Sequence, residues 1–528
     1  MIGGLIERLD DVLEVGLRLA PDKVAVIQGS RRVTFRHLEE RVNRVANGLR
    51  DIGVGCGDRV MLLLPNDIAF VETFLGVIRS GAVVVPANPR QSEAYVRHVA
   101  VDSRATLVVA PARRRLEMDE LRSVSPSLQR VALVRLDPEE CNDRSPLAAH
   151  EIDYGEWLAA ASPMRPMSTA LPTDVCMQPY TSGTTGRAKG VLLNHRGQLD
   201  NAEAARQCRL LNADERSVVA VPLFHANALS GTVLPALLAA ASIVIVPAFD
   251  AVEVLETVVA EGCTFIGGVP AMFRMLLDAL PALPGLDLSG VRQISCGSAP
   301  VPAHLFDDLQ RAFPAARISE GYGLTEGGPV VLASPRLGLS KRGSAGVPLP
   351  GVEVRIGPTG EVPDDEVGEL WVRNTGVTIG YHNLPEVGAD RIDRDGWLRT
   401  GDLFRRDADG YYFYVGREDD MINSGGENVY PKEVENLLLE HPGIRDACVV
   451  GLPHPVKGEV PVAFVALAPG TDLDPDAVKR FALQHGAAHA HPRFVEVLDA
   501  LPLTTAGKPD RPSLTARALE VFRARDRS

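Results

Sequence analysis

A chain of 528 residues is too long for one compact core, so its length predicts at least two domains. Its hydrophobic fraction of 45% and charged fraction of 23% are those of a globular protein. The formal net charge of −13 argues against a general nucleic-acid binder, because a phosphate backbone requires a basic surface.

The cysteines and the N-terminal residues indicate the cellular compartment of the protein. Seven cysteines are scattered without a Cys-x-x-Cys pair, which disfavours both a disulfide framework and a zinc site. Glu7, Asp10 and Asp11 stand where a secretory signal would need positive charge followed by an apolar run. We therefore expect a cytoplasmic protein. Its oligomeric state is not readable from the sequence, and a homodimer stays open.

Helical and buried-strand patterns alternate in the first part of the chain. Apolar residues at spacings of three and four predict an amphipathic helix over 35–49. Short continuous apolar runs at 60–64, 82–85 and 106–109 are typical of strands buried on both faces. Such alternation predicts a layered α/β structure with ligands at the strand ends.

The stretch from Ala226 to Phe249 carries no charge and is long enough to span a bilayer. It is interrupted by Gly231, Pro235 and Pro247, and residues 242–247 have the pattern of a separate short strand. We therefore expect a buried helix followed by a buried strand, and no transmembrane span.

The pattern changes after about residue 350, where dense turn signals between short strands predict a β-rich subdomain. A charged connector at 416–420 precedes a tail that reads β-turn, helix, strand, strand, helix, strand. Pro431 stands at the expected first turn of the first of these helices. We expect a large layered N-terminal domain over 1–416, with α/β subdomains and a β-rich subdomain. A small α+β domain is expected over 417–528.

The segment from Tyr180 to Gly190 has the components of a phosphate-binding loop, and it lies between apolar strands expected at 175–177 and 191–193. Its glycines allow tight turns that expose backbone N–H groups, and its hydroxyls and Lys189 add donors. It is not a Walker loop, because Ala188 stands where Gly-Lys would be required. A surface hairpin rich in Ser, Thr and Gly is the alternative.

This loop resembles the phosphate-binding signature of the adenylate-forming superfamily, which includes acyl- and aryl-CoA synthetases, peptide-synthetase adenylation domains and beetle luciferases. Further signatures of that superfamily follow in order over nearly the whole chain. The resemblance assigns ATP to these positions: Thr181, Ser182, Gly183, Thr184, Thr185, Gly186, Lys189, Gly297, Ser298, Ala299, Pro300, Glu320, Gly321, Tyr322, Gly323 and Thr325. It implies that Tyr322 lies against adenine and that Glu326 binds Mg²⁺.

Later signatures imply a mobile C-terminal domain. Asp402 resembles the aspartate that binds both ribose hydroxyls, and Arg417 would touch the ribose. Asp419 resembles the hinge residue. The loop Ser424, Gly425 and Gly426 resembles the segment that enters the site for the coenzyme A step, although a simple turn is its alternative. Lys508 resembles the lysine that assists adenylation.

The resemblance implies an ATP-dependent ligase that converts a carboxylic acid to acyl-AMP and then to acyl-CoA. Lys508, Glu326, Thr185 and His225 would be catalytic, with His225 as an aromatic gate. An uncharged aliphatic or aromatic acid is expected, because the expected pocket carries small residues and no charge. That pocket comprises His225, Gly267, Gly268, Val269, Gly297 and Gly323.

Two other functions stay open. An adenylating enzyme that loads a carrier protein, or performs one half-reaction, is the main alternative. His489 and Ala490 stand where many members have a Tyr-Lys pair, which bears on how the small domain docks. A non-catalytic nucleotide-binding protein would be expected to lack Lys508 or Glu326, and both are present.

Overall fold

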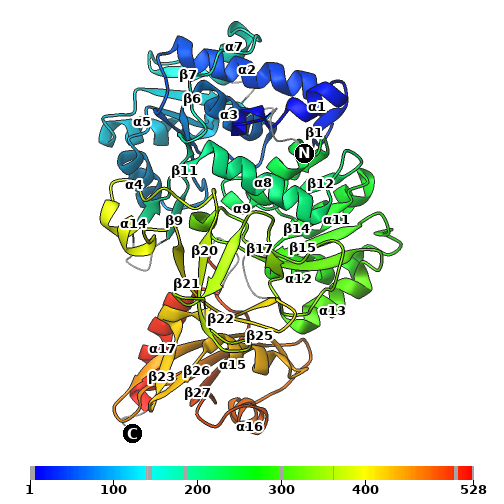
Figure 1. The fold of residues 1–528 in the computed structure, drawn as a ribbon, viewed down its shortest axis with the longest axis vertical. Coiled ribbons are helices and arrows are strands. Elements are labelled where there is room, and N and C mark those ends of the chain that lie inside the picture. The colour runs from blue at the N-terminus through cyan, green and yellow to red at the C-terminus, as the bar shows by residue number, and fades with distance from the viewer. Residues whose placement is uncertain are drawn as a thin grey trace.

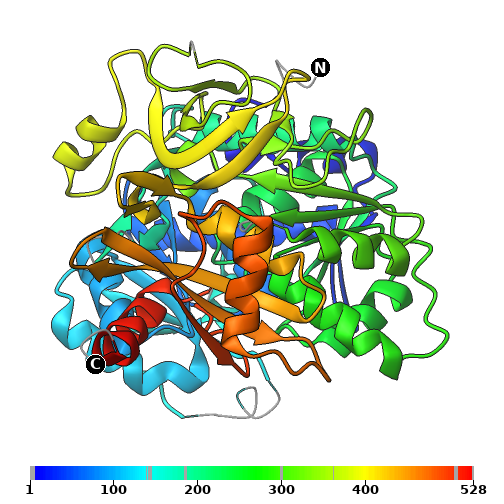
Figure 2. The same cartoon turned by 90° about the horizontal axis from the view of Figure 1, so that it is seen from below.

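A computed structural model describes residues 6–137, 140, 145–182, 187–297, 301–360, 362–504 and 509–525 (Figure 1). They form a large N-terminal α/β domain and a small C-terminal α+β domain, which the orange and red ribbon marks in Figure 1. Viewed from below, this small domain lies nearest the viewer (Figure 2). The mixed α/β architecture expected from the sequence is confirmed.

A seven-stranded sheet occupies the upper part of the molecule (Figure 1). It is parallel except for its edge strand β11. In spatial order its strands are β11 (Leu193–Asn194), β8 (Val175–Met177), β4 (Val83–Pro86), β3 (Arg59–Leu62), β5 (Leu107–Pro111), β6 (Arg130–Val134) and β7 (Glu151–Asp153).

A nine-stranded sheet lies beside it, with a parallel centre and antiparallel pairs at both edges. In spatial order its strands are β18 (Val347–Pro348), β17 (Leu332–Ala333), β16 (Arg317–Tyr322), β15 (Gln293–Gly297), β14 (Phe265–Gly268), β12 (Arg216–Val219), β13 (Ser242–Ile245), β1 (Val24–Gln28) and β2 (Arg31–Thr34). Because parallel strands end at one edge, the carboxyl ends of β14, β15 and β16 meet there.

Helices cover both faces of both sheets, as parallel sheets require. The main hydrophobic core lies between the sheets and contains side chains from α2 (Phe35–Asp51), α3 (Ile68–Ser80), α8 (His195–Arg209) and α10 (Leu234–Leu238). Two further cores cover the outer faces. They involve α11 (Ala251–Ala260), α12 (Pro270–Ala279) and α13 (Ala303–Ala312) on the nine-stranded sheet, and α4 (Glu93–Ser103) and α5 (Arg115–Val124) on the other.

The helix expected over 35–49 is α2. The Thr34 side chain accepts a hydrogen bond from the backbone N–H of His37 at 3.2 Å, which satisfies a free donor at the helix start. Its periodic apolar side chains are fully buried. The three expected early strands are β3, β4 and β5, displaced by one or two residues. The strand expected at 191–193 is wrong in position, because residues 188–190 form β10 instead and β11 begins at Leu193.

The uncharged stretch forms a buried helix followed by the strand β13, as expected. The helix comprises α9 (Ala226–Ala228), a π-helical turn η3 (Leu229–Val233) and α10. The sequence pattern did not indicate the π turn, a feature that recurs at functional sites. Among the described helices, none has the combination of length and hydropathy needed to cross a bilayer.

The β-rich region is a four-stranded antiparallel sheet of β19 (Glu353–Ile356), β20 (Gly368–Arg373), β21 (Leu398–Arg406) and β22 (Tyr412–Arg417). The tail then follows the expected order and adds a final helix. Its elements are β23 (Ile422–Ser424), β24 (Glu427–Val429), α15 (Pro431–Leu439), β25 (Ile444–His454), β26 (Gly458–Leu467), α16 (Pro475–His485), β27 (Phe494–Leu498) and α17 (Arg511–Arg525).

The close packing of α2 on α3 depends on Gly76. A Cβ atom at Gly76 would lie 2.4 Å from Val45 Cβ and 3.0 Å from the carbonyl oxygen of Val42. We expect Gly76→Ala to lower the free energy of unfolding by about 1–3 kcal/mol, because the two helices must separate. Gly290→Ala is the control, since its Cβ would meet no atom within 4 Å. Urea denaturation tests this, and equal midpoints for the two variants would contradict it.

Candidate functional site

The two ends of the phosphate-loop segment form the paired strands of a β-hairpin. The strand β9 (Tyr180–Ser182) pairs antiparallel with β10 (Ala188–Gly190), which sets Lys189 opposite Thr181. The tip, Gly183, Thr184, Thr185 and Gly186, lies outside the described residues. The Lys189 ammonium lies 5.9 Å from the centroid of the Tyr381 ring. The hairpin backbone is compatible with both expectations from the sequence, and phosphate binding by the loop stays a prediction.

Glu326 lies next to this hairpin, on the short helix η5 (Thr325–Gly327). Its Oε1 accepts hydrogen bonds from Tyr381 Oη at 3.0 Å and from Thr181 Oγ1 at 3.4 Å. Arg391 Nη1 lies 3.8 Å from the same oxygen and donates to Tyr381 Oη at 2.9 Å. The structure therefore brings Glu326 next to Thr181 and Lys189, although Glu326 is more than 100 residues further along the sequence.

Tyr381 and Arg391 were not identified from the sequence. Tyr381 follows Gly380, and Arg391 is the last residue of α14 (Pro385–Arg391). Burial and the nearby Glu326 carboxylate raise the pKa of Tyr381, so its hydroxyl stays a donor. The only sequence signal near these two residues was the turn around Gly380. It indicates a bend in the chain and not a ligand-binding residue.

Glu326 suits a hard divalent cation. The three contacts that the described residues make with its carboxylate all fall on Oε1, which leaves Oε2 available as a ligand. Magnesium is bound through one or two carboxylates together with substrate phosphates, so a single glutamate beside a phosphate loop fits it.

A second group of predicted residues converges on Asp402. Tyr322 Oη donates a hydrogen bond to Asp402 Oδ2 at 2.5 Å, and Arg417 Nη1 donates to Asp402 Oδ1 at 3.2 Å. Asp402 and Arg417 are opposite each other in the β21–β22 register. The rings of Phe404 and Tyr322 pack in a T-shaped arrangement, with centroids 4.8 Å apart. Burial and Asp402 raise the pKa of Tyr322, which keeps this hydroxyl protonated.

Glycines at the strand ends allow close approach of neighbouring backbone beside these groups. Gly297 and Gly321 are paired in the β15–β16 register, and a Cβ at Gly297 would lie 3.1 Å from the Gly321 carbonyl oxygen. A Cβ at Gly323 would lie 1.9 Å from the carbonyl oxygen of Pro329, so no side chain fits there. Ser298, Ala299 and Pro300 lie outside the described residues.

The structure brings together only some of the residues that were predicted to line the acid pocket. His225 immediately precedes α9, and a Cβ at Gly267 would lie 3.0 Å from Thr232 Oγ1 of the π turn. Gly268 is a correction, because a Cβ there would meet the Phe273 ring at 3.0 Å on the opposite face of the sheet. Successive residues of a strand point to opposite faces, so Gly267 and Gly268 cannot both line one pocket. Val269 follows as the residue before α12.

Glu320 also points away from the glycine-lined face. It is paired with Cys296, which belongs to the core beneath α11, α12 and α13. Its Oε1 accepts the backbone N–H of Gly343 at 2.8 Å. Burial raises the pKa of Glu320 to about 7.

The predicted hinge and coenzyme A loop residues lie where the chain leaves the four-stranded sheet and enters the sheet of the C-terminal domain. Asp419 is in the short helix η6 (Glu418–Asp420), 4.0 Å from Arg417 Nη2. Ser424 and Glu427 are paired across a two-residue turn in which Gly425 has φ +68° and Gly426 has φ +91°. Two consecutive positive φ angles favour glycine, as in type I′ hairpins. Lys508 lies outside the described residues.

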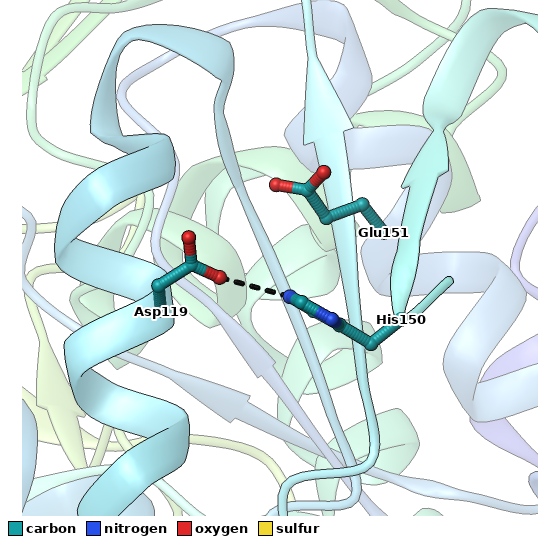
Figure 3. A group of neighbouring side chains, drawn as sticks. All are labelled: Asp119, His150 and Glu151. Atoms are coloured by element: carbon teal, nitrogen blue, oxygen red, sulfur yellow. Dashed lines mark hydrogen bonds and ion pairs between the residues drawn. The ribbon is translucent and has the colours of Figure 1, made fainter. Parts of the chain in front are cut away.

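One further group of possible metal ligands is present in the described part of the chain: Asp119, His150 and Glu151 (Figure 3). His150 Nε2 lies 2.8 Å from Asp119 Oδ1. Both carboxylate oxygens of Glu151 accept from Arg115, at 2.5 Å each. This ion pair neutralises the buried Glu151 carboxylate and links β7 to α5.

Comparisons with known proteins agree with this arrangement. The model of the AMP-binding enzyme family matches residues 13–382, and that of the AMP-binding enzyme C-terminal domain matches residues 433–508. The chain is 39% identical to a feruloyl-CoA synthase of Amycolatopsis sp over 93% of this chain and 95% of that protein. It is 32% identical to 4-coumarate–CoA ligase 5 of Oryza sativa subsp. japonica, over 94% of this chain and 92% of that protein. The anthranilate CoA ligase AuaEII, solved in complex with anthranoyl-AMP, superposes with a TM-score of 0.88 at 27% identity and 98% coverage of each chain.

The raised pKa of Glu320 predicts a pH-dependent stability. The folded protein holds the Glu320 proton up to a pKa of about 7, whereas the unfolded chain releases it near 4.5, so stability falls as pH rises between these values. We expect Glu320→Gln to melt at a higher temperature than the parent at pH 8 and at a similar temperature at pH 5. Glu366→Gln, on an exposed loop, is the control. A difference in melting temperature that does not change with pH would contradict this account.

Proposed function

We infer that this chain, which belongs to the AMP-binding enzyme family, is an acid–thiol ligase that joins a carboxylic acid to coenzyme A with ATP. In the first half-reaction the acid carboxylate attacks the α-phosphorus of ATP, which forms acyl-AMP and releases pyrophosphate. In the second, the thiol of coenzyme A attacks the acyl carbon, and AMP leaves. The observation that carries this function is the convergence of the Thr181–Lys189 hairpin, Glu326 and the Tyr322–Asp402 pair near the carboxyl ends of β15 and β16.

The proposed acid is aromatic. The relatives named above act on aryl acids, as their names state. We propose that the flat ring of the acid lies beside the backbone of Gly267 and Gly297 at this edge of the sheet. This narrows the expectation from sequence, which left aliphatic acids open.

We propose the following roles for the charged groups. Attack of a carboxylate on a polyanion requires that negative charge be neutralised, and Lys508, Lys189 and the hydroxyl of Thr185 would provide donors for this. Glu326 would hold Mg²⁺, which would neutralise charge on the phosphates. Asp402 and Arg417 would bind the ribose, and Tyr322 would lie against adenine. His225 would gate the approach to the acid carboxylate.

We propose that residues 417–528 move relative to residues 1–416 between the half-reactions. The strand β22 ends at Arg417 in one sheet and β23 begins at Ile422 in another, so only η6 and its flanks join the two. A short connector of this kind can absorb a large change in backbone angles, with Asp419 as the pivot. The turn at Gly425 and Gly426 would then approach the site in place of Lys508. We also propose a cytoplasmic location, in keeping with seven scattered cysteines.

An exchange assay with an acid panel tests the proposed function. ATP–pyrophosphate exchange should be fastest with aryl acids such as ferulate and 4-coumarate, and slower with straight-chain fatty acids and dicarboxylates. Adding coenzyme A should yield the thioester and AMP in equal amounts. Exchange without thioester would instead indicate an enzyme that loads a carrier protein or performs one half-reaction. No exchange with any acid would contradict the ligase function.

A further inference from the structure

One side of helix α4 holds both strands of the hairpin formed by β9 and β10. His98 and Asp102 are four residues apart on α4, so their side chains lie one above the other on the same side of the helix. His98 Nε2 lies 2.8 Å from the carbonyl oxygen of Ala188 in β10, and the ring donates because a carbonyl only accepts. Tyr180 Oη in β9 donates to Asp102 Oδ2 at 2.6 Å. Each strand of the hairpin is therefore hydrogen-bonded to α4.

The hydroxyl of Tyr180 is held from two sides. Gln178 Nε2 donates a hydrogen bond to Tyr180 Oη at 3.0 Å, and the hydroxyl itself donates to Asp102. A Cβ at Gly190, which pairs with Tyr180 in the hairpin, would lie 2.8 Å from Gln178 Nε2 and 3.1 Å from Tyr180 Cζ. Burial and the Asp102 carboxylate raise the pKa of Tyr180, so its hydroxyl stays a donor. These contacts fix the ring in one orientation.

The opposite face of the hairpin carries residues that are expected to bind ATP. Successive residues of a strand point to opposite faces, so Thr181 points away from α4. Thr181 Oγ1 donates to Glu326 Oε1 at 3.4 Å, and Lys189 is paired with Thr181 across the hairpin. Cross-strand partners project from the same face, so Lys189 lies on this side as well. The hairpin therefore stands between α4 and the carboxylate of Glu326.

A further link joins α4 to the segment that holds Glu326. Asn383 Nδ2 donates to the carbonyl oxygen of Asp102 at 3.2 Å and to its Oδ1 at 3.4 Å. The same segment pairs with the chain beyond the hairpin through the antiparallel bridge between Val191 and Tyr381. Tyr381 Oη in turn donates to Glu326. Asp102 therefore contacts both the hairpin and the segment that orients the expected metal ligand.

We propose that His98 and Asp102 are positioning residues that hold the hairpin and the Glu326 segment in one arrangement, and so determine the affinity for ATP with its magnesium ion. This inference rests on the proposed function, in which Lys189 and Glu326 act on the phosphates and the metal. His98 and Asp102 do not touch the nucleotide themselves. Each bonds a hairpin residue that stands next to one expected to bind ATP, so loss of either bond displaces that neighbour.

Removing the Tyr180–Asp102 hydrogen bond from either end tests this role. We would measure Kd of ATP with Mg²⁺ by calorimetry, and KM for ATP and for the acid in ATP–pyrophosphate exchange, in the parent, Tyr180→Phe, Asp102→Leu and the double variant. Each single variant should raise Kd and KM for ATP about tenfold, because groups that orient a ligand-binding residue affect affinity on that scale. KM for the acid should change by less than about twofold. The double variant should match Asp102→Leu, since both changes remove the same bond.

Two further variants separate the hydrogen bonds from the packing of the side chains. His98→Phe keeps an aromatic ring beside Tyr180 and removes only the donor to Ala188. It should raise Kd of ATP about fivefold or more, because β10 loses its bond to α4. Asp102→Asn is the conservative change, and it should stay within about threefold of the parent because its amide oxygen still accepts from Tyr180.

Tyr154→Phe is the matched control. Tyr154 is the first residue of α7 (Tyr154–Ala160), and its Oη donates to Glu72 Oε1 of α3 at 2.9 Å. The change therefore removes the same hydroxyl from another tyrosine–carboxylate pair, which joins α7 to α3. It should lower the melting temperature as Tyr180→Phe does and leave Kd of ATP unchanged. If Asp102→Leu does not fold, Tyr180→Phe alone decides, because it removes a single oxygen atom.

Each outcome decides a different claim. If the parent and the Tyr180→Phe and Asp102→Leu variants bind ATP equally well, the positioning role is overturned and the ligase function stays intact. Equal rises in KM for ATP and for the acid would also overturn it, because a general loss of folded structure affects both substrates alike. A parent that binds no ATP would overturn the proposed function and this inference with it.

Discussion

The carboxylate of Asp402 joins two sheets that share no strand. It accepts from Tyr322 at the end of the nine-stranded sheet and from Arg417 at the last strand of the four-stranded sheet. A buried carboxylate that accepts two hydrogen bonds is held in one orientation, because releasing either donor leaves a polar group unsatisfied. The residues expected to bind adenine and ribose are therefore held in a fixed arrangement before any nucleotide binds. The connector to the C-terminal domain begins at Glu418, the residue after Arg417.

The surrounding fold explains why this edge is available for ligands. Parallel strands bring β14, β15 and β16 to a common edge, and glycines stand at or near the end of each strand. The antiparallel pairs β16–β17 and β17–β18 then lead the chain toward the four-stranded sheet. Topology thus assembles the edge at which ligands bind in open α/β sheets.

The sequence predicted elements whose signal is local. The helix at Phe35–Asp51 and the buried early strands follow from periodicity and apolar runs, which depend only on neighbouring residues. The glycine- and hydroxyl-rich signatures were also recognisable, because a tight turn or a close approach of backbone restricts which residue types a position can hold. Tyr322, Asp402 and Arg417 were each identified singly, whereas their mutual hydrogen bonds required the fold.

Residues that act through long-range partners were missed. Tyr381 and Arg391 could be recognised only from their position beside Glu326 in the fold. Gly268 was assigned to the pocket because sequence adjacency does not reveal which face of a strand a residue occupies.

The central claim is that the nucleotide binds where Tyr322, Asp402 and Arg417 meet, beside Glu326 and the Thr181–Lys189 hairpin. A crystal structure with a non-hydrolysable acyl-adenylate tests it most directly. We expect the ribose hydroxyls within hydrogen-bonding distance of Asp402, the adenine against Tyr322 and the acyl group between Gly267 and Gly297. An adenylate bound at any other surface, with the Tyr322–Asp402 pair unaltered and remote from the ligand, would contradict the account.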